Sequence, residues 1–241
     1  MPELLKKHFI FWMLPSAYCL LIMALYFSGN HALIDWVTPR TMTYPWSDYG
    51  DRELGLLENA QHLLILGCIF VLIKGWPSLV HWLQKLGVGV ALLVLTFMFC
   101  EEIDYGTHYW DFITGAAQFE GDVNYHNTSK NTNRMKQIAD LGMVIWLVIL
   151  PLIAARSKNP WLRYFAPTRM FFFTVIAAVC VSKFAHYLDD AGYAIRHSLS
   201  NNISEYRELF TYYTWLLYCV VMVRQTWPGK AGDTGQDAEA A

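Results

Sequence analysis

The spacing of long apolar stretches is the feature that most constrains the fold of this chain. A helix needs about 20 mostly apolar residues to cross the hydrocarbon core of a bilayer, and six stretches approach or reach that length. Hydrophobic residues make up 55% of the 241 residues and charged residues only 16%, whereas soluble domains have about 25% charged residues. The sequence therefore predicts an all-α, polytopic integral membrane bundle. The predicted spans are residues 9–27, 58–73, 86–104, 138–155, 170–188 and 205–223.

Basic residues mark one side of this predicted bundle. Lys and Arg are frequent at the N-terminus, after the second and fourth spans, and near the C-terminus. Because such residues favour the cytoplasmic side, both termini are predicted to be cytoplasmic. Aromatic residues near the other ends of the spans, such as Tyr105 and Tyr109, are expected at the level of the lipid headgroups. Residues 1–227 form one predicted domain, and residues 228–241 have the composition of a disordered tail.

The third predicted span ends in a pair of acids. Glu101 and Glu102 follow a fully apolar run, and adjacent carboxylates repel each other unless one is protonated, paired with a cation or bound to a metal. If the helix continues beyond this pair, one of its faces carries four polar residues. These are Glu101, Asp104, His108 and Asp111. The alternative is that the pair only marks the point at which the helix meets water.

Three other spans carry ionisable residues at the same end. The fifth span places Lys183, His186 and Asp190 on one stripe, and Lys183 lies inside an otherwise apolar helix. Such a lysine either marks a functional site or extends toward the interface. Two further pairs have helical spacing, and we expect all four helices to direct their groups into one outer cavity, as in helix bundles that bind metal ions. The pairs are Glu58 with His62, and Glu205 with Glu208.

The loop after the third span contains further donors and acceptors. The segment AQFEGDVNYHNTSKNTNR is rich in such side chains, and its position after an acidic pair favours a lid or a ligand-bearing loop. A solvated polar loop is the alternative. The candidate residues are Glu120, Asn124, His126 and Asn127.

The run CEEIDYG, followed by FEGDVNYHN, resembles the motif of a family of uncharacterised prokaryotic polytopic membrane proteins. In that family Ser replaces Asp104, while Gln and Arg replace Thr107 and His108, so this chain is more acidic at the shared positions. The resemblance implies a polar site in a prokaryotic inner membrane and no particular reaction. The distribution of Lys and Arg predicts that this site lies on the extracytoplasmic side. The matching residues are Glu101, Glu102, Ile103, Tyr105, Gly106, Glu120, Asn124, His126 and Asn127.

Several functional classes are disfavoured by composition and motif. A net charge of −2 provides no basic field that would attract nucleic acid. The chain has no HExxH, no GxSxG and no phosphate-binding glycine loop. The expected partners are therefore the lipid bilayer and a lipid or lipid-linked substrate, and nucleic acid is not among them.

Three functions remain open. The first is a membrane-embedded enzyme, such as a hydrolase that uses a divalent metal, with a site at the extracytoplasmic interface. The second is a proton-coupled carrier, although the inner halves of the third, fourth and fifth spans are nearly all apolar. The third is a non-catalytic membrane subunit or assembly factor. The catalytic candidates for the enzyme are Glu101, Glu102, His126 and Lys183, and its metal-ligand candidates are Glu101, Glu120, His126, His186 and Asp190.

Overall fold

The computed structural model describes residues 3–38, 55–115, 132–193 and 204–225, and all regular structure in these ranges is helical. In two places within these ranges, a short π-helical turn joins two α-helices. The elements are α1 (Glu3–His8), η1 (Phe9–Met13), α2 (Leu14–Tyr26), α3 (His31–Val37), α4 (Leu56–Gly75), η2 (Trp76–Ser78), α5 (Trp82–Glu102), η3 (Asp104–Gly106), α6 (Thr107–Thr114), α8 (Thr132–Val144), η4 (Ile145–Ile149), α9 (Leu150–Arg156), α10 (Pro160–Phe165), α11 (Phe171–Asp190) and α12 (Ser204–Arg224).

Among the described segments, four are long and apolar enough to cross a membrane. They are Glu3–Tyr26, Leu56–Ser78, Trp82–Glu102 and Phe171–Asp190, and they coincide with the first, second, third and fifth predicted spans. The prediction of an all-helical chain with membrane-length helices is thus confirmed to that extent. The fourth and sixth predicted spans are also helical, in α8–η4–α9 and in α12, and the number of six crossings stays a prediction.

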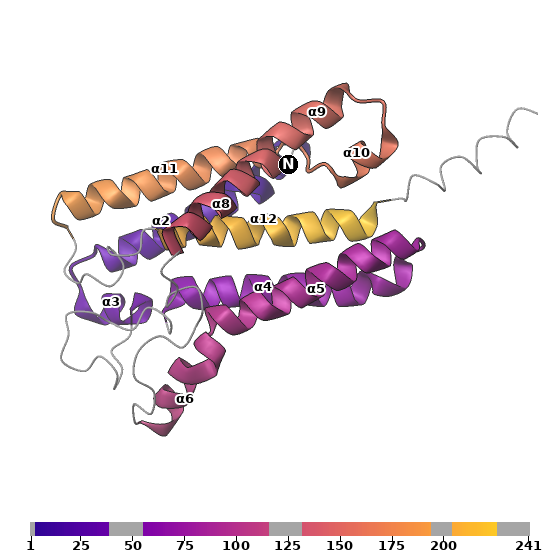
Figure 1. The fold of residues 1–241 in the computed structure, drawn as a ribbon. Coiled ribbons are helices and arrows are strands. Elements are labelled where there is room, and N and C mark those ends of the chain that lie inside the picture. Colours follow the sequence, from indigo (N-terminus) through magenta and orange to yellow (C-terminus); the bar gives the residue numbers. More distant parts are fainter. Residues whose placement is uncertain (1–2, 39–54, 116–131, 194–203, 226–241) are drawn as a thin grey trace, which may run out of the picture.

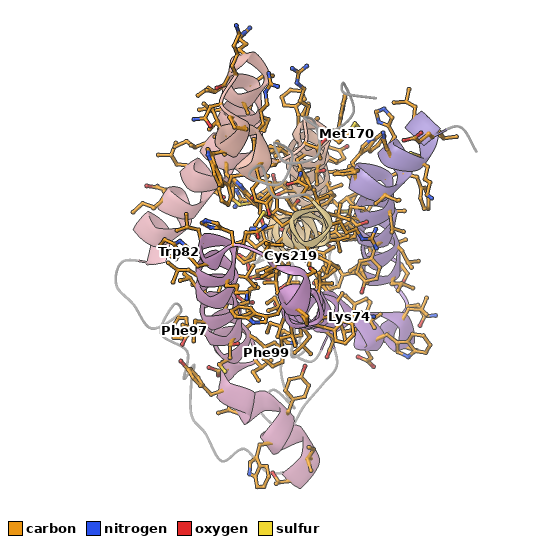
Figure 2. The ribbon with its side chains drawn as sticks, turned by 90° about the vertical axis from the view of Figure 1, so that its right-hand side faces the viewer. Lys74, Trp82, Phe97, Phe99, Met170 and Cys219 are labelled. Carbon is orange, nitrogen blue, oxygen red and sulfur yellow. The ribbon has the colours of Figure 1, made fainter. Side chains whose placement is uncertain are left out.

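The outward surface of α5 has the character expected next to lipid. Leu86, Val90, Leu93 and Phe97 recur at helical spacing and are all exposed, Leu93 to 74%. Figure 2 shows Phe97 pointing away from the bundle, whereas Phe99 lies on the side of the neighbouring helix. A continuous apolar stripe of this kind is costly in water and favourable against acyl chains.

Helix α12 lies in the middle of the bundle. It packs against α4, α11 and α2, and α5 packs alongside α4 (Figures 1 and 2). Between residues 205 and 224 only Arg207 and Arg224 are exposed. Because neighbouring helices shield α12, it accommodates polar residues such as Glu205 and Thr214, both buried, that a helix facing lipid would not tolerate.

Successive long helices run in opposite directions, so the starts of some helices lie beside the ends of others (Figure 1). The two ends of the bundle differ in the side chains that they carry. At one of them α4 and α12 begin, while α2, α5 and α11 end. We call it the acidic end, because Glu58, Glu101, Asp104 and Glu205 are buried there. The opposite end carries many of the basic residues, including Lys74, Arg156 and Arg224 in the last turns of their helices.

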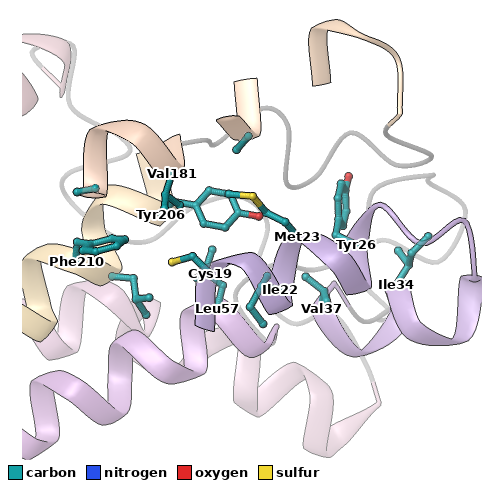
Figure 3. Packing of buried hydrophobic residues seen from close by; sticks show 13 residues of the cluster. Cys19, Ile22, Met23, Tyr26, Ile34, Val37, Leu57, Val181, Tyr206 and Phe210 are labelled. Atoms are coloured by element: carbon teal, nitrogen blue, oxygen red, sulfur yellow. The ribbon is translucent and has the colours of Figure 1, made fainter. Parts of the chain in front are cut away.

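A hydrophobic cluster supports the acidic end. It joins α2, α3, α4, α11 and α12, and the side chains interdigitate around Tyr206, which is 1% exposed (Figure 3). A second cluster, which includes Ile65, Leu95 and Cys219, continues between α4, α5 and α12 toward the other end. Close packing of this kind holds the polar side chains of the acidic end in fixed positions. The first cluster contains Cys19, Ile22, Met23, Tyr26, Ile34, Val37, Leu57, Ala178, Val181, Ala185, Tyr206, Leu209 and Phe210.

At the opposite end, a capping box begins α5. The His81 ring accepts from the backbone N–H of Leu83 at 3.2 Å, and Gln84 Oε1 accepts from the N–H of His81 at 3.0 Å. The amide nitrogen of the buried Gln84 then donates to the Tyr164 hydroxyl on α10 at 2.7 Å. This bond ties the short α10 helix to the start of α5.

Replacing Tyr164 with phenylalanine is expected to destabilise the protein by about 1–2 kcal/mol, because the buried Gln84 amide loses its acceptor. Thermal unfolding of the purified protein in detergent measures the effect. Tyr187→Phe is the matched control, since the Tyr187 side chain is 65% exposed. Equal unfolding temperatures for the two variants would contradict the prediction.

Candidate functional site

Three helices meet at the acidic end through hydrogen bonds between their polar side chains. Gln61 on α4 donates to the Glu205 carbonyl oxygen on α12 at 3.0 Å and to Glu205 Oε2 at 3.2 Å. Tyr212 on α12 donates to Glu102 Oε1 on α5 at 2.7 Å. His62 on α4 lies 3.2 Å from the backbone carbonyl of Glu102. These contacts bring α4, α5 and α12 into one polar network.

Helix α5 stops just after its two acids, because the chain turns into the left-handed region. Ile103 caps the helix, and φ is 48° at Asp104, 52° at Tyr105 and 85° at Gly106 before α6 begins at Thr107. Each residue other than glycine that adopts this left-handed conformation destabilises the fold by roughly 1–2 kcal/mol. The condition for one shared polar face, a helix that continues beyond the acid pair, is therefore not met, and Glu101 and Asp104 do not belong to one helical face with His108 and Asp111. The side chains of His108 and Asp111 lie outside the described residues.

Local hydrogen bonds hold this turn. The Tyr105 hydroxyl donates to Glu101 Oε1, and Thr107 Oγ1 donates to the Asp104 carbonyl at 2.9 Å and approaches Asp104 Oδ2 at 3.1 Å. The bond to Glu101 raises the pKa of the Tyr105 phenol. Since the folded chain then holds this proton more tightly than the unfolded chain, the stabilising contribution is present below about pH 10 and is lost as the pH rises through the raised pKa.

The two adjacent acids point to different partners. Glu101 pairs with Tyr105 on its own segment, whereas Glu102 binds Tyr212 on α12. Consecutive helical residues project about 100° apart, which separates the two carboxylates without the need for a shared cation. Their expected repulsion is thus reduced by geometry.

His62 is the centre of a network that can exchange a proton. The Glu102 carbonyl can only accept, so the His62 Nε2 atom, 3.2 Å away, carries a proton. On the other side of the ring, Nδ1 lies 3.0 Å from the Tyr109 hydroxyl. That hydroxyl is also 2.8 Å from Asn59 Oδ1. The Asn59 amide nitrogen donates to the Gly55 carbonyl at 2.8 Å, and this bond fixes which side of the amide faces Tyr109.

Two protonation states fit this arrangement. When Nδ1 of His62 is bare, Tyr109 donates its single proton to Nδ1. When Nδ1 is protonated, Nδ1 donates to Tyr109, and Tyr109 donates to Asn59. The network therefore passes from one state to the other by rotation of one hydroxyl, with no movement of the helices. Such a histidine is suited to taking up and releasing a proton.

The predicted residues on α11 lie elsewhere. Lys183 and His186 line a pocket with Arg207 of α12, and Asp190 is exposed at the end of α11. Helix α12 separates this pocket from the network, because Glu205 faces α4 while Arg207, about 200° further round the helix, binds Asp140 on α8. The structure thus divides the predicted polar residues between two places, and the described residues do not bring His186 to Glu101.

The predicted metal site is not assembled within the described residues. In this part of the chain no three His, Cys, Asp or Glu side chains are grouped so that they could hold a metal ion. Among the predicted ligands, Glu120 and His126 lie outside the described residues, as do Asn124 and Asn127 of the same loop. Of the remaining predicted residues, Glu58, Glu101, Asp104 and Glu205 are buried at the acidic end, His62 is buried in the network, and Glu208 lies half-buried on α12.

Sequence reasoning missed the neutral members of the network. Gln61 is completely buried, and its Oε1 atom has no hydrogen-bond donor among the described residues. Tyr109 was expected to be an interfacial anchor, yet its hydroxyl joins two helices. Tyr212 lies in the apolar core cluster and binds an acid with its hydroxyl. One sequence signal could have indicated these residues: the polar positions at the start of α4 have the spacing of one helical face. They are Glu58, Asn59, Gln61 and His62.

Comparison with known proteins assigns the chain to no family. No family model, no curated protein and no solved structure matches it. The function is accordingly inferred from the hydrogen-bond network and from the position of this network at one end of membrane-length helices.

Proposed function

We propose that the chain is an integral membrane enzyme that uses general acid–base catalysis on the polar headgroup of a lipid or lipid-linked substrate. The observation that carries the proposal is the His62 network, which accommodates a second ring proton by rotation of the Tyr109 hydroxyl. Positioned groups of this kind accelerate proton transfer by about 10²–10⁴. The buried setting among packed helices keeps bulk water away from the transfer.

The proton path can be written atom by atom. A substrate hydroxyl, or a water that attacks the headgroup, gives its proton to the Tyr109 oxygen, while Tyr109 gives its own proton to His62 Nδ1. The proton on Nε2 stays on the ring, and its hydrogen bond to the Glu102 carbonyl keeps the ring oriented. The Glu102 backbone carbonyl accepts from Nε2 and so also stabilises the imidazolium that forms. The catalytic residue is Tyr109, which contacts the substrate, and His62 is the proton acceptor behind it.

The proposal includes six crossings, with both termini in the cytoplasm and the acidic end on the extracytoplasmic side of a prokaryotic inner membrane. It is supported by the basic residues at the opposite end, which the positive-inside rule puts in the cytoplasm. Cysteines introduced one at a time at Trp36 and Lys158, both exposed, test this in a background without the exposed Cys180 and the half-buried Cys100. A membrane-impermeant reagent added outside should label only the first position, and the reverse labelling would overturn the orientation.

Activity is tested with the purified protein in vesicles made from a total polar lipid extract. Mass spectrometry of the lipids should show a headgroup change that depends on the protein and disappears in Tyr109→Phe. An unchanged lipid profile, across extracts that include lipid-linked sugars and phosphates, would overturn the enzyme proposal.

A metal-dependent form of the same enzyme is tested separately. Its ligands would include Glu101, Glu120 and His126, and elemental analysis of the parent protein and of Glu101→Gln measures the bound metal. Stoichiometric metal that is lost in the variant would support this form, and its absence from the parent would remove it.

A further inference from the structure

A second polar feature lies on the other side of α12 and is separate from the network described above. It is a pocket of about 240 Å³ between α11 and α12. Its α11 residues recur with the spacing of one helical face. The lining consists of Val179, Ser182, Lys183, His186 and Arg207.

The described lining is basic. Lys183 and Arg207 are cations, His186 adds an imidazole ring, and no carboxylate lines the pocket among the described residues. Lys183 and His186 have no hydrogen-bond or ion-pair partner in the part of the chain that the structure describes. Arg207 pairs with Asp140 at 3.3 Å, which uses one of its five N–H donors. Asp189 and Asp190 lie beyond His186 at the end of α11. Within the described residues, the pocket therefore has hydrogen-bond donors without acceptors and positive charge without a matching negative charge.

The depth of the pocket matches the headgroup region of a bilayer. Helix α11 belongs to the membrane-length segment Phe171–Asp190, and Lys183 lies about 10 Å below Asp190 along the helix axis. A lysine at such a depth extends its amine along the helix toward the interface. An uncompensated ammonium group there needs a counter-charge.

An apolar stripe continues from the pocket along α11. Phe172, Ile176 and Val179 are each exposed to more than 40% and share a helical face with Lys183. A basic pocket above an exposed apolar stripe fits an amphiphile whose anionic group lies at the top and whose chain runs down the helix.

From these observations we infer that the Lys183–His186–Arg207 pocket binds the phosphate of a glycerophospholipid, with one acyl chain along Val179, Ile176 and Phe172. The phosphodiester accepts from the ammonium and guanidinium groups in charge-assisted hydrogen bonds. The buried Ser182 hydroxyl is a further donor in the lining. The inference does not depend on the proposed enzyme activity, because it rests on α11 and on the opposite face of α12.

The experiment is lipid binding to the delipidated protein in detergent, followed by native mass spectrometry. Three probes separate the sources of the signal: phosphatidylglycerol, a diacylglycerol with the same chains but no phosphate, and inorganic phosphate. Phosphatidylglycerol should bind, and diacylglycerol and inorganic phosphate should bind at least tenfold more weakly. Lys183→Gln should weaken phosphatidylglycerol binding about tenfold, the range expected for one charge-assisted contact. Lys183→Arg should retain it.

Lys85→Gln is the matched control, because Lys85 is an exposed lysine of the membrane-length helix α5 outside the pocket. It should bind phosphatidylglycerol like the parent. Since Lys183 is exposed and has no partner among the described residues, the Lys183 variants should unfold at the parent temperature. Unchanged binding by Lys183→Gln, equal binding of diacylglycerol, or inorganic phosphate binding as tightly as the lipid would each overturn the inference.

Discussion

Replacing His62 with glutamine is expected to reduce the rate of the headgroup reaction by a factor of about 10²–10⁴. The glutamine amide nitrogen can still donate to the Glu102 carbonyl, and its oxygen can still accept from Tyr109, so the neutral hydrogen-bond pattern survives. What the variant cannot do is accept a proton at the position of Nδ1. The rate is measured by mass spectrometry of lipids in reconstituted vesicles.

The controls for this variant separate loss of proton transfer from loss of structure. His31→Gln changes an exposed histidine of α3 and should leave the rate unchanged. The unfolding temperature of His62→Gln should stay within a few degrees of the parent, because its neutral hydrogen bonds are kept. A His62→Gln protein that is folded and as fast as the parent would show that His62 moves no proton in the reaction.

Replacing Gly75 with alanine is expected to destabilise the protein by about 3 kcal/mol, the upper end of what overpacking costs. Helix α12 comes so close to α4 at this position that an added Cβ would lie 1.7 Å from Val223 Cγ1 and 2.9 Å from Val223 Cβ. The two helices would have to separate. The expected change is a fall in Tm of about 6–12 °C for a chain of this size, measured by thermal unfolding in detergent.

The Gly75 prediction can be tested with a double-mutant cycle. Val223→Ala removes the closest clash, so the variant with both substitutions should recover much of the stability that Gly75→Ala loses. Gly87→Ala in α5 is the matched control, because an added Cβ there meets nothing within 4 Å. That substitution should be neutral or slightly stabilising, since alanine favours the helix. If Gly75→Ala and Gly87→Ala behave alike, the close approach of α4 and α12 is wrong.

The helices could be predicted from the sequence because the bilayer imposes a length and an apolar character on each crossing. The predicted third span ends within two residues of the last helical residue, Glu102. The break that follows was not predicted. Gly106 was the only local sign of it, and Asp104 and Tyr105 adopt a conformation that their own side chains disfavour.

The composition of the site could be predicted only in part. Buried acids and His62 gather at one end, because ionisable residues at the ends of several spans can stabilise one another there. The separation of Lys183 and His186 from Glu101 could not be read from spacing, since a sequence does not tell which face of α12 meets which neighbour. In the structure, Glu205 and Arg207 point in nearly opposite directions from α12, so the network and the pocket lie on opposite sides of this helix.

The left-handed turn at Asp104–Gly106 has a consequence for how this protein can change over time. Glycine at position 105 would relieve the backbone and would also delete the phenol that binds Glu101. The two effects on stability oppose each other, so laboratory selection for heat resistance should accept Tyr105→Gly only together with a second substitution that gives Glu101 another hydrogen-bond donor.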